Sequence, residues 1–173
     1  KTVITNIAHA PEETQLDGEH WGGSWKVLTP FMRERGGRLG VAYNRLPPGR
    51  AGCPFHAHQR EDEVFLVIEG EGVLRYGDEI HVIGAGDCVA CPAGTGIAHQ
   101  IANTSERDLV YLAMGPHDPD EVCIYPDSGK VMVRSLRHVG RLERTEYMAG
   151  EQTRPKIFEM AARREAGEPP NGA

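Results

Sequence analysis

Strand-length segments recur at close spacing between residues 39 and 114, and glycine-rich turns separate them. β-Branched and aromatic residues are frequent in RLGVAYNRL (38–46), EVFLVIEG (63–70) and DLVYLAMG (108–115), as is typical of strands. Short strands joined by tight turns bury their apolar faces only by folding back on one another. The pattern therefore predicts an antiparallel β-sandwich or β-barrel.

Turn residues interrupt two further strand-like stretches. GVLRYGDEIHVI (72–83) predicts two short strands around Gly77-Asp78, a pair that favours a tight hairpin. EVCIYPDSGKVMVRSL (121–136) predicts more strand, broken by a Pro-Asp-Ser-Gly turn. Within it, YPDSGK (125–130) faintly resembles a phosphate-cradling turn, but it lacks the glycine spacing and helix start of a P-loop. We interpret it as a tight turn packed near the barrel.

The two ends of the chain differ from this middle. DGEHWGGSWKVLT (17–29) is rich in turn-forming residues around two tryptophans, and residues 1–37 give no clear pattern. Apolar residues follow helix spacing only in RPKIFEMAARREAG (154–167), with Pro155 suited to a first turn. The last seven residues, GEPPNGA, are expected to be frayed.

Size and charge restrict the class of protein. A chain of 173 residues has the size of one domain and buries a core without help from disulfides. The formal net charge of −6 argues against a nucleic-acid-binding protein, which usually carries a basic stripe. An apolar run of about 18 residues, as a membrane span needs, does not occur. The first residues also lack the apolar core of a secretory signal, so we expect a cytoplasmic protein.

The four cysteines do not form a recognisable metal or disulfide framework. Cys88 and Cys91 make a CxxC pair, but it lies in an extended segment, where residues three apart point to opposite faces. Cys53 and Cys123 supply no second pair to complete an all-cysteine site. We therefore predict that Cys88 and Cys91 are small buried apolar residues in a reduced protein.

Two histidines, His56 and His58, precede an apolar strand. Residues i and i+2 of a strand share a face, so both imidazoles can reach one point in space. A divalent metal needs further donors, often including a carboxylate, and Glu63 lies five residues beyond His58. His99, in the apolar context GIAHQIAN, is the downstream histidine best placed to add a fourth donor.

These residues match two known motifs. The first motif is HxH followed by three or four residues, a Glu, six residues and a Gly. His56, His58, Glu63 and Gly70 match it. The second motif is a Gly followed by five residues, PxG, two residues, a His, three residues and an Asn. It is matched by Gly86, Pro92, Gly94, His99 and Asn103. Four residues, instead of two, separate Gly94 from His99, and a two-residue loop insertion accounts for this because Gly96 restores the spacing. Six residues, instead of five, separate the leading Gly49 from His56.

In these motifs the chain resembles the cupin superfamily, specifically small single-domain metal-binding cupins. The resemblance implies an all-β fold, a double-stranded β-helix or jelly-roll barrel, followed here by the short C-terminal helix. It implies one cupin domain over residues 1–173, with a barrel core at about 36–115, an N-terminal arm at 1–35 and a C-terminal extension at 116–173. It also implies a homodimer that takes a small-molecule ligand.

By the same resemblance, one divalent ion per chain (Zn, Fe, Mn or Ni) would be bound by His56, His58, Glu63 and His99. Three alternatives stay open. An isolated HxH is more often polar surface than ligand, the metal can be purely structural, and Glu63 can act as a general base without ligating. Glu61 and Asp62 are rival carboxylates, but only Glu63 has the six-residue step to Gly70. The remaining histidines have no partner pattern and are expected at the surface: His9, His20, His81, His117 and His138.

Several functions are compatible with such a site. The first is a small metalloenzyme acting on an oxygen-rich molecule, similar to sugar-phosphate isomerases and epimerases or to dioxygenases, since cupins host many chemistries. The alternative is a non-catalytic module that binds a sugar or a carboxylate through the metal. A structural dimer whose metal only pins strands together is a third, weaker possibility.

Overall fold

We describe residues 3–166 from a computed structural model, so the terminal GEPPNGA lies outside the described residues. The contacts divide the chain into two units, Lys1–Arg141 and Leu142–Ala173. The first unit holds the β-structure and a five-residue helix, α1 (Pro30–Glu34). The second holds helix α2 (Lys156–Glu165), where the sequence predicted a helix, and none of its residues is buried.

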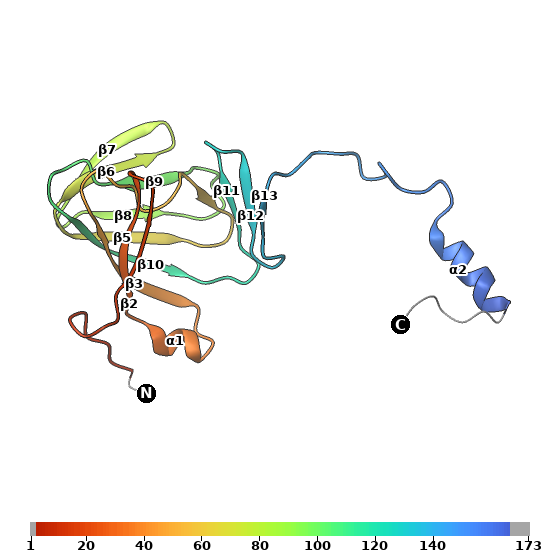
Figure 1. Cartoon of the computed structure of the whole chain (residues 1–173), viewed down its shortest axis with the longest axis horizontal. Helices are drawn as coiled ribbons and strands as arrows, with labels where there is room; N and C mark the ends of the chain where they lie inside the picture. Colours follow the sequence, from red (N-terminus) through yellow and green to blue (C-terminus); the bar gives the residue numbers. More distant parts are fainter. Residues whose placement is uncertain (1–2, 167–173) are drawn as a thin grey trace. The chain divides into compact units, whose positions relative to one another are not determined.

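The strands follow one another closely along the first unit (Figure 1). They are β1 (Glu13–Asp17), β2 (Trp21–Val27), β3 (Leu39–Leu46), β4 (Ala57–His58), β5 (Glu63–Glu69), β6 (Glu71–Tyr76), β7 (Glu79–Gly84), β8 (Cys88–Cys91), β9 (His99–Ala102), β10 (Leu109–Pro116), β11 (Val122–Tyr125), β12 (Lys130–Val133) and β13 (His138–Gly140). Within residues 3–166, no helix has the length and the apolarity needed to cross a membrane.

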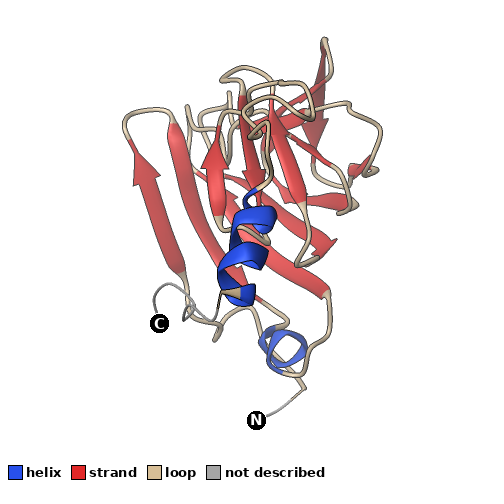
Figure 2. Ribbon diagram, turned by 90° about the vertical axis from the view of Figure 1, so that its right-hand side faces the viewer, coloured by secondary structure: helices blue, strands red, loops and turns tan. Residues whose placement is uncertain are grey.

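Every strand pairs antiparallel with its neighbours, and the strands form three groups that pack together (Figure 2). The largest has the order β1-β2-β3-β10-β5-β8, and the smallest has the order β7-β6-β9. The third, β13-β12-β11-β4, brings the segment after β10 back beside the two histidines of the HxH pattern. The antiparallel all-β architecture predicted from the sequence is confirmed.

The core lies between the large sheet and the β6–β7–β9 group. It combines residues from β3, β5, β8 and β10 of the large sheet with residues from β6, β7 and β9, as a two-layer β-structure requires. Its buried members are Leu46, Phe65, Val67, Leu74, Ile83, Cys91, Ile101, Leu109 and Tyr111. Leu109 is completely buried, which fits its place where the two layers meet.

Gly70 explains one fixed position of the first motif. It joins β5 to β6 with φ of +83°, a left-handed conformation that side chains disfavour. A Cβ at this position would overlap the carbonyl oxygen of Asp108, the residue before β10. The turn therefore needs both the backbone freedom of glycine and its missing side chain.

Three features differ from the sequence predictions. The hairpin β1–β2 extends the large sheet, although the sequence of these residues shows no apolar alternation. Strand β1 is exposed along its whole length, so it needs no apolar face. Helix α1 is too short to show a helical period. Cys88 is exposed, whereas Cys91 is buried, so the prediction that both are buried is wrong for Cys88. Residues three apart in a strand face opposite sides, and β8 lies at a sheet edge with one side open.

Candidate metal centre

The backbone itself brings two histidines of the predicted site together. The His56 N–H donates to the His99 carbonyl oxygen at 3.1 Å, and the His99 N–H donates to the His56 carbonyl oxygen at 2.8 Å. Residues paired in this way have side chains on one face, a few ångströms apart. His58 lies two residues along the same extended segment, and Glu63 is the first residue of β5. Four chain positions thus converge on one point.

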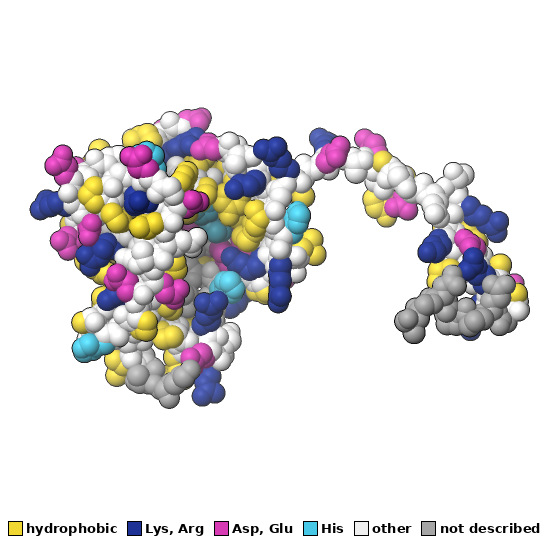
Figure 3. Space-filling model, viewed as in Figure 1, with side chains coloured by type: hydrophobic (Ala, Val, Ile, Leu, Met, Phe, Trp, Pro, Cys, Tyr) yellow, Lys and Arg dark blue, Asp and Glu magenta, His cyan; other side chains and the backbone are white. Residues whose placement is uncertain are grey.

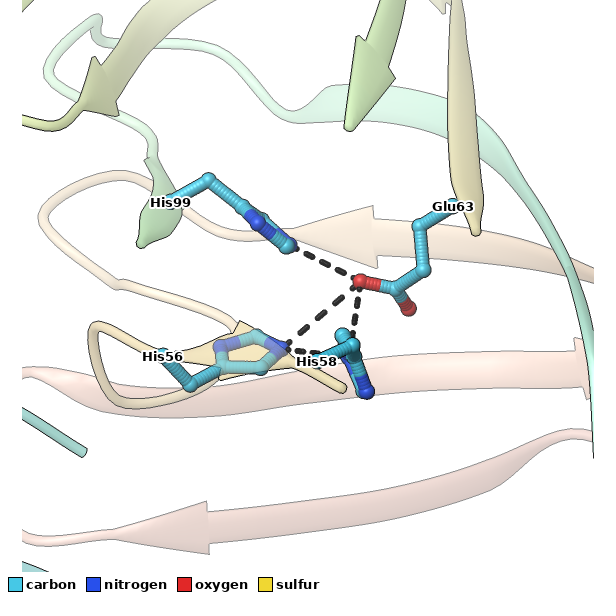
Figure 4. A group of neighbouring side chains, drawn as sticks. All are labelled: His56, His58, Glu63 and His99. Carbon is cyan, nitrogen blue, oxygen red and sulfur yellow. Dashed lines mark hydrogen bonds and ion pairs between the residues drawn. The ribbon is translucent and has the colours of Figure 1, made fainter. Parts of the chain in front are cut away.

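Figure 4 shows the four side chains directed toward one another, with the Glu63 carboxylate as the common neighbour. Glu63 Oε2 lies 2.8 Å from His99 Nε2, 3.1 Å from His58 Nε2 and 3.7 Å from His56 Nε2. The Nε2 atoms of His56 and His58 are 3.1 Å apart. The structure therefore brings together every residue of the predicted ligand set.

Burial and hydrogen bonding act in opposite directions on these groups. Burial would raise the pKa of Glu63, but hydrogen bonds with the three imidazoles hold that pKa well below its usual range. Burial would lower the pKa of His56, but hydrogen bonds with Cys53 and Glu63 outweigh it and raise the pKa to about 11. Without a cation, Glu63 and His56 therefore form an ion pair.

The chemistry of the donors fits a divalent metal. Ligand atoms about 2.0–2.2 Å from a metal lie roughly 3 Å from one another, and the donor atoms of the cluster all lie within 4.8 Å of each other. His56 Nδ1 donates to the Pro54 carbonyl oxygen at 2.7 Å, so the proton that a metal would displace is the one on Nε2, the nitrogen that faces the cluster. A mixed set of nitrogen and oxygen donors accepts several first-row metals.

His58 has carboxylates behind it. Its Nδ1 is buried and has no hydrogen-bond partner among the described residues, but Glu121 Oε1 lies 3.4 Å away and Glu61 Oε2 lies 3.7 Å away. Glu121 is fully buried on the segment leading into β11, and it accepts the N–H groups of Gln59 at 2.8 Å and Arg60 at 3.0 Å. A carboxylate behind a ligating histidine fixes the tautomer of its ring.

The rival carboxylates have other partners. Both oxygens of Glu61 accept hydrogen bonds from the Arg134 guanidinium, and Asp62 Oδ1 accepts the Ala93 N–H at 2.9 Å. His58, Glu61 and Glu121 also lie close enough to suggest a second cation site, but these contacts already occupy the two carboxylates. Of these three carboxylates, Glu63 is the one that lies among all three imidazoles of the cluster.

The histidines without a partner pattern are all exposed, as predicted: His9, His20, His81, His117 and His138. Glu121 was not found from the sequence, because no spacing relates it to the HxH pattern. Its contact with His58 depends on the pairing of β11 with β4, which joins Cys123 to His58. A register between distant strands is not visible in either segment alone.

A cavity of about 710 Å³ opens beside the cluster and reaches it at Glu63. Figure 3 shows histidine, acidic and hydrophobic side chains meeting in a hollow on this unit. The cavity wall includes aromatic residues and hydrogen-bonding side chains from β1, β2, β3, β5, β10, the segment before β4, the β11–β12 turn and the start of β12. They are Gln15, Asp17, Trp21, Ser24, Trp25, Asn44, Phe55, Phe65, Tyr111, Asp127, Ser128 and Lys130.

Comparison with known proteins agrees with the motifs and the geometry. The family profile of the cupin domain matches residues 42–115, which include both motifs from His56 onward and the strands from β4 to β9. Residues 42–115, which carry the cluster, therefore match a cupin domain. The chain's antiparallel jelly-roll, followed by a short C-terminal helix, is the fold that the sequence resemblance predicted.

The similar proteins have more than one function. An oxalate-binding protein of Thermotoga maritima is 37% identical over 70 residues, which are 40% of this chain and 55% of the relative. The chain thus matches only about half the length of that relative. A sugar phosphate isomerase of Silicibacter pomeroyi, solved as a crystal structure, is 25% identical with a TM-score of 0.67, over 83% of this chain and 96% of that one. A predicted oxalate decarboxylase of T. maritima, also a crystal structure, is 25% identical with a TM-score of 0.58, over 68% of this chain and 100% of that one.

Proposed function

We propose that this chain binds one divalent metal ion through the cluster of His56, His58, Glu63 and His99. The observation that carries the proposal is the convergence of three imidazole nitrogens on Glu63 Oε2, within 2.8–3.7 Å. These distances suit donors that share one cation. The donor set is compatible with Zn, Fe, Mn or Ni and does not choose among them.

We further infer that the site acts on a small oxygen-rich molecule, and isomerisation or epimerisation of a sugar phosphate is the reaction that we favour. Asp17, Gln15 and Asn44 offer hydrogen-bond partners for hydroxyl groups, while Trp21 and Trp25 offer flat apolar faces. A related fold is that of a sugar phosphate isomerase. A dioxygenase-like reaction would use the same residues with redox-active iron.

Each group has a definable part in such a reaction. A divalent ion supplies Lewis acidity, which polarises a carbonyl or stabilises an enediolate oxygen. The Pro54 carbonyl holds the tautomer of His56, and the Glu121 carboxylate is placed to do the same for His58. Glu63 would serve as the anionic ligand, because its Oε2 lies among all three imidazoles.

A non-catalytic binding module is the second candidate. The 37% identity to an oxalate-binding protein over 70 residues favours it. In that case the same cluster and cavity would hold a carboxylate or a sugar without turnover. A homodimer, a cytoplasmic location and a single domain over residues 1–173 stay predictions.

Proton exchange in D₂O separates the two candidates. The metal-loaded protein is incubated with aldose and ketose phosphates of three to six carbons, and deuterium uptake next to the carbonyl is followed by NMR. An isomerase exchanges this proton through an enediolate, and His99→Ala abolishes the exchange. Binding without exchange would support the binding module, oxygen uptake would support a dioxygenase, and neither binding nor exchange would contradict both.

A further inference from the structure

The turn between β11 and β12 forms one wall of the cavity that leads to the cluster. This turn is YPDSGK (125–130), and its Asp127, Ser128 and Lys130 line the same cavity as Glu63. The N–H groups of Ser128 and Gly129 both donate to the Tyr125 carbonyl oxygen, at 3.2 Å and 2.9 Å. Because these two amides serve the turn itself, a ligand would meet the side chains of the turn.

The turn is held in place by contacts to the barrel. Asp127 receives two hydrogen bonds from Arg75 on β6, at 2.7 Å and 3.2 Å. The Arg75 guanidinium in turn lies 3.5 Å from the centre of the Phe55 ring, which also lines the cavity. The two hydrogen bonds from Arg75 neutralise the Asp127 carboxylate. Together with the contact between Arg75 and Phe55, they hold the turn in place just before Lys130, the first residue of β12.

Lys130 is the one Lys or Arg among the described residues that line the cavity. Its Nζ lies 5.6 Å from the centre of the Tyr125 ring, and no carboxylate of residues 3–166 lies within salt-bridge distance of it. Tyr125 stacks on His56 with ring centres 6.1 Å apart and planes at 28°. Lys130 Nζ therefore lies no farther from the centre of the His56 ring than the sum of these two distances.

From this arrangement we propose that Lys130, with the Ser128 hydroxyl beside it, binds the anionic end of an elongated ligand whose other end reaches the metal cluster. The ligand class is a polyhydroxylated chain with a terminal phosphate or carboxylate, that is, a sugar phosphate or a sugar acid. Asp17, Gln15 and Asn44 face its hydroxyl groups from the same cavity. The inference rests on the proposed function, because it assumes that the cluster binds the other end.

The length of the ligand discriminates between the candidate classes. The two carboxylate carbons of oxalate are joined by one C–C bond of about 1.5 Å, so oxalate has a much shorter reach than a sugar phosphate. Lys130 Nζ lies no farther from the His56 ring than the sum of two steps of 6.1 Å and 5.6 Å, a separation that a sugar phosphate of three to six carbons can span. The proposal therefore takes the elongated ligand, and the oxalate probe tests the short one.

The test is calorimetry on the metal-loaded full chain with pairs of ligands. The probes are sugar phosphates and sugar acids of three to six carbons, their neutral sugars, inorganic phosphate and oxalate. We expect at least one anionic sugar to bind more tightly than its neutral partner, and Lys130→Met to weaken it about 10- to 100-fold, as expected for a hydrogen bond between charged groups. Lys130→Arg should retain most of the affinity. Comparing the affinities of the sugar phosphates with those of the sugar acids identifies which anionic group the site prefers.

Lys156→Met is the matched control, because Lys156 is an exposed lysine on α2 and is not among the residues that line the cavity. It should bind every probe as the unmodified protein does. The inference is overturned if Lys130→Met binds the anionic sugars with unchanged affinity, if no anionic sugar binds better than its neutral partner, or if oxalate binds best. Metal content is measured on the same samples, so a failure of the metal site is recognised separately as a protein that retains no ion.

Discussion

Replacing Glu121 by Gln tests whether the groups behind the histidines organise the site. Glu121 is fully buried, accepts the N–H groups of Gln59 and Arg60, and faces His58 Nδ1 at 3.4 Å. In Glu121→Gln one acceptor oxygen becomes an NH₂ group, which cannot accept an N–H. One charge-assisted hydrogen bond is lost, which we expect to cost about 2–3 kcal/mol of stability. Metal affinity should fall about 10- to 100-fold, because His58 loses the carboxylate behind its ring.

Chelator competition measures the metal affinity, and denaturant unfolding of the metal-free protein measures the stability. Asp62→Asn is the matched control, because the same change is made next to Glu63. Among residues 3–166, the Asp62 side chain accepts the Ala93 N–H at 2.9 Å and pairs with no histidine. It should leave metal affinity within about twofold of the unmodified protein. Unchanged metal affinity in a folded Glu121→Gln protein would refute the role assigned to Glu121.

Three further predictions follow from single contacts. Asn103→Asp should lose about 2–4 kcal/mol of unfolding free energy with little change in metal affinity, because the Asn103 amide donates to the carbonyls of Leu46 and Arg107 at 2.7 Å each; a loss under about 0.5 kcal/mol would contradict this. Gly70→Ala should lose about 1–3 kcal/mol more unfolding free energy than Gly86→Ala, because both positions have positive φ but, of the two, a Cβ overlaps other atoms at Gly70 alone. Equal losses in denaturant unfolding would contradict this prediction. The raised pKa of His56 means that metal binding displaces its proton, so affinity measured by chelator competition should rise about tenfold per pH unit between about pH 7 and about pH 9; a flat profile in that range would contradict the pairing with Glu63.

Much of the fold could be predicted because its signals are local. Strands β3, β5 and β10 carry apolar residues typical of strands, and the turn at Gly77 separates β6 from β7 as expected. The candidate ligands could be predicted for a related reason. His56, His58 and Glu63 lie within eight consecutive residues, and the second motif relates His99 to nearby glycines and Pro92.

The features that were missed depend on long-range contacts. Strand β1 has no buried residue, so only its pairing with β2 makes it a strand. Glu121 contacts His58 because β11 pairs with β4, more than sixty residues earlier in the chain. The YPDSGK turn was correctly predicted as a turn. The Asp127–Arg75 ion pair, which holds it against β6 beside the cavity, joins segments about fifty residues apart and is not visible in either one.

The metal content of the protein tests the central claim most directly. The purified chain, reconstituted with a divalent ion at neutral pH and dialysed, is analysed by mass spectrometry of its metals beside His56→Ala and His99→Ala. We predict about one ion per chain for the unmodified protein and a loss of that ion in both variants, which should keep their β-sheet circular dichroism. An unmodified protein without bound metal, or variants that retain the full ion, would contradict the assignment of the cluster as a metal centre.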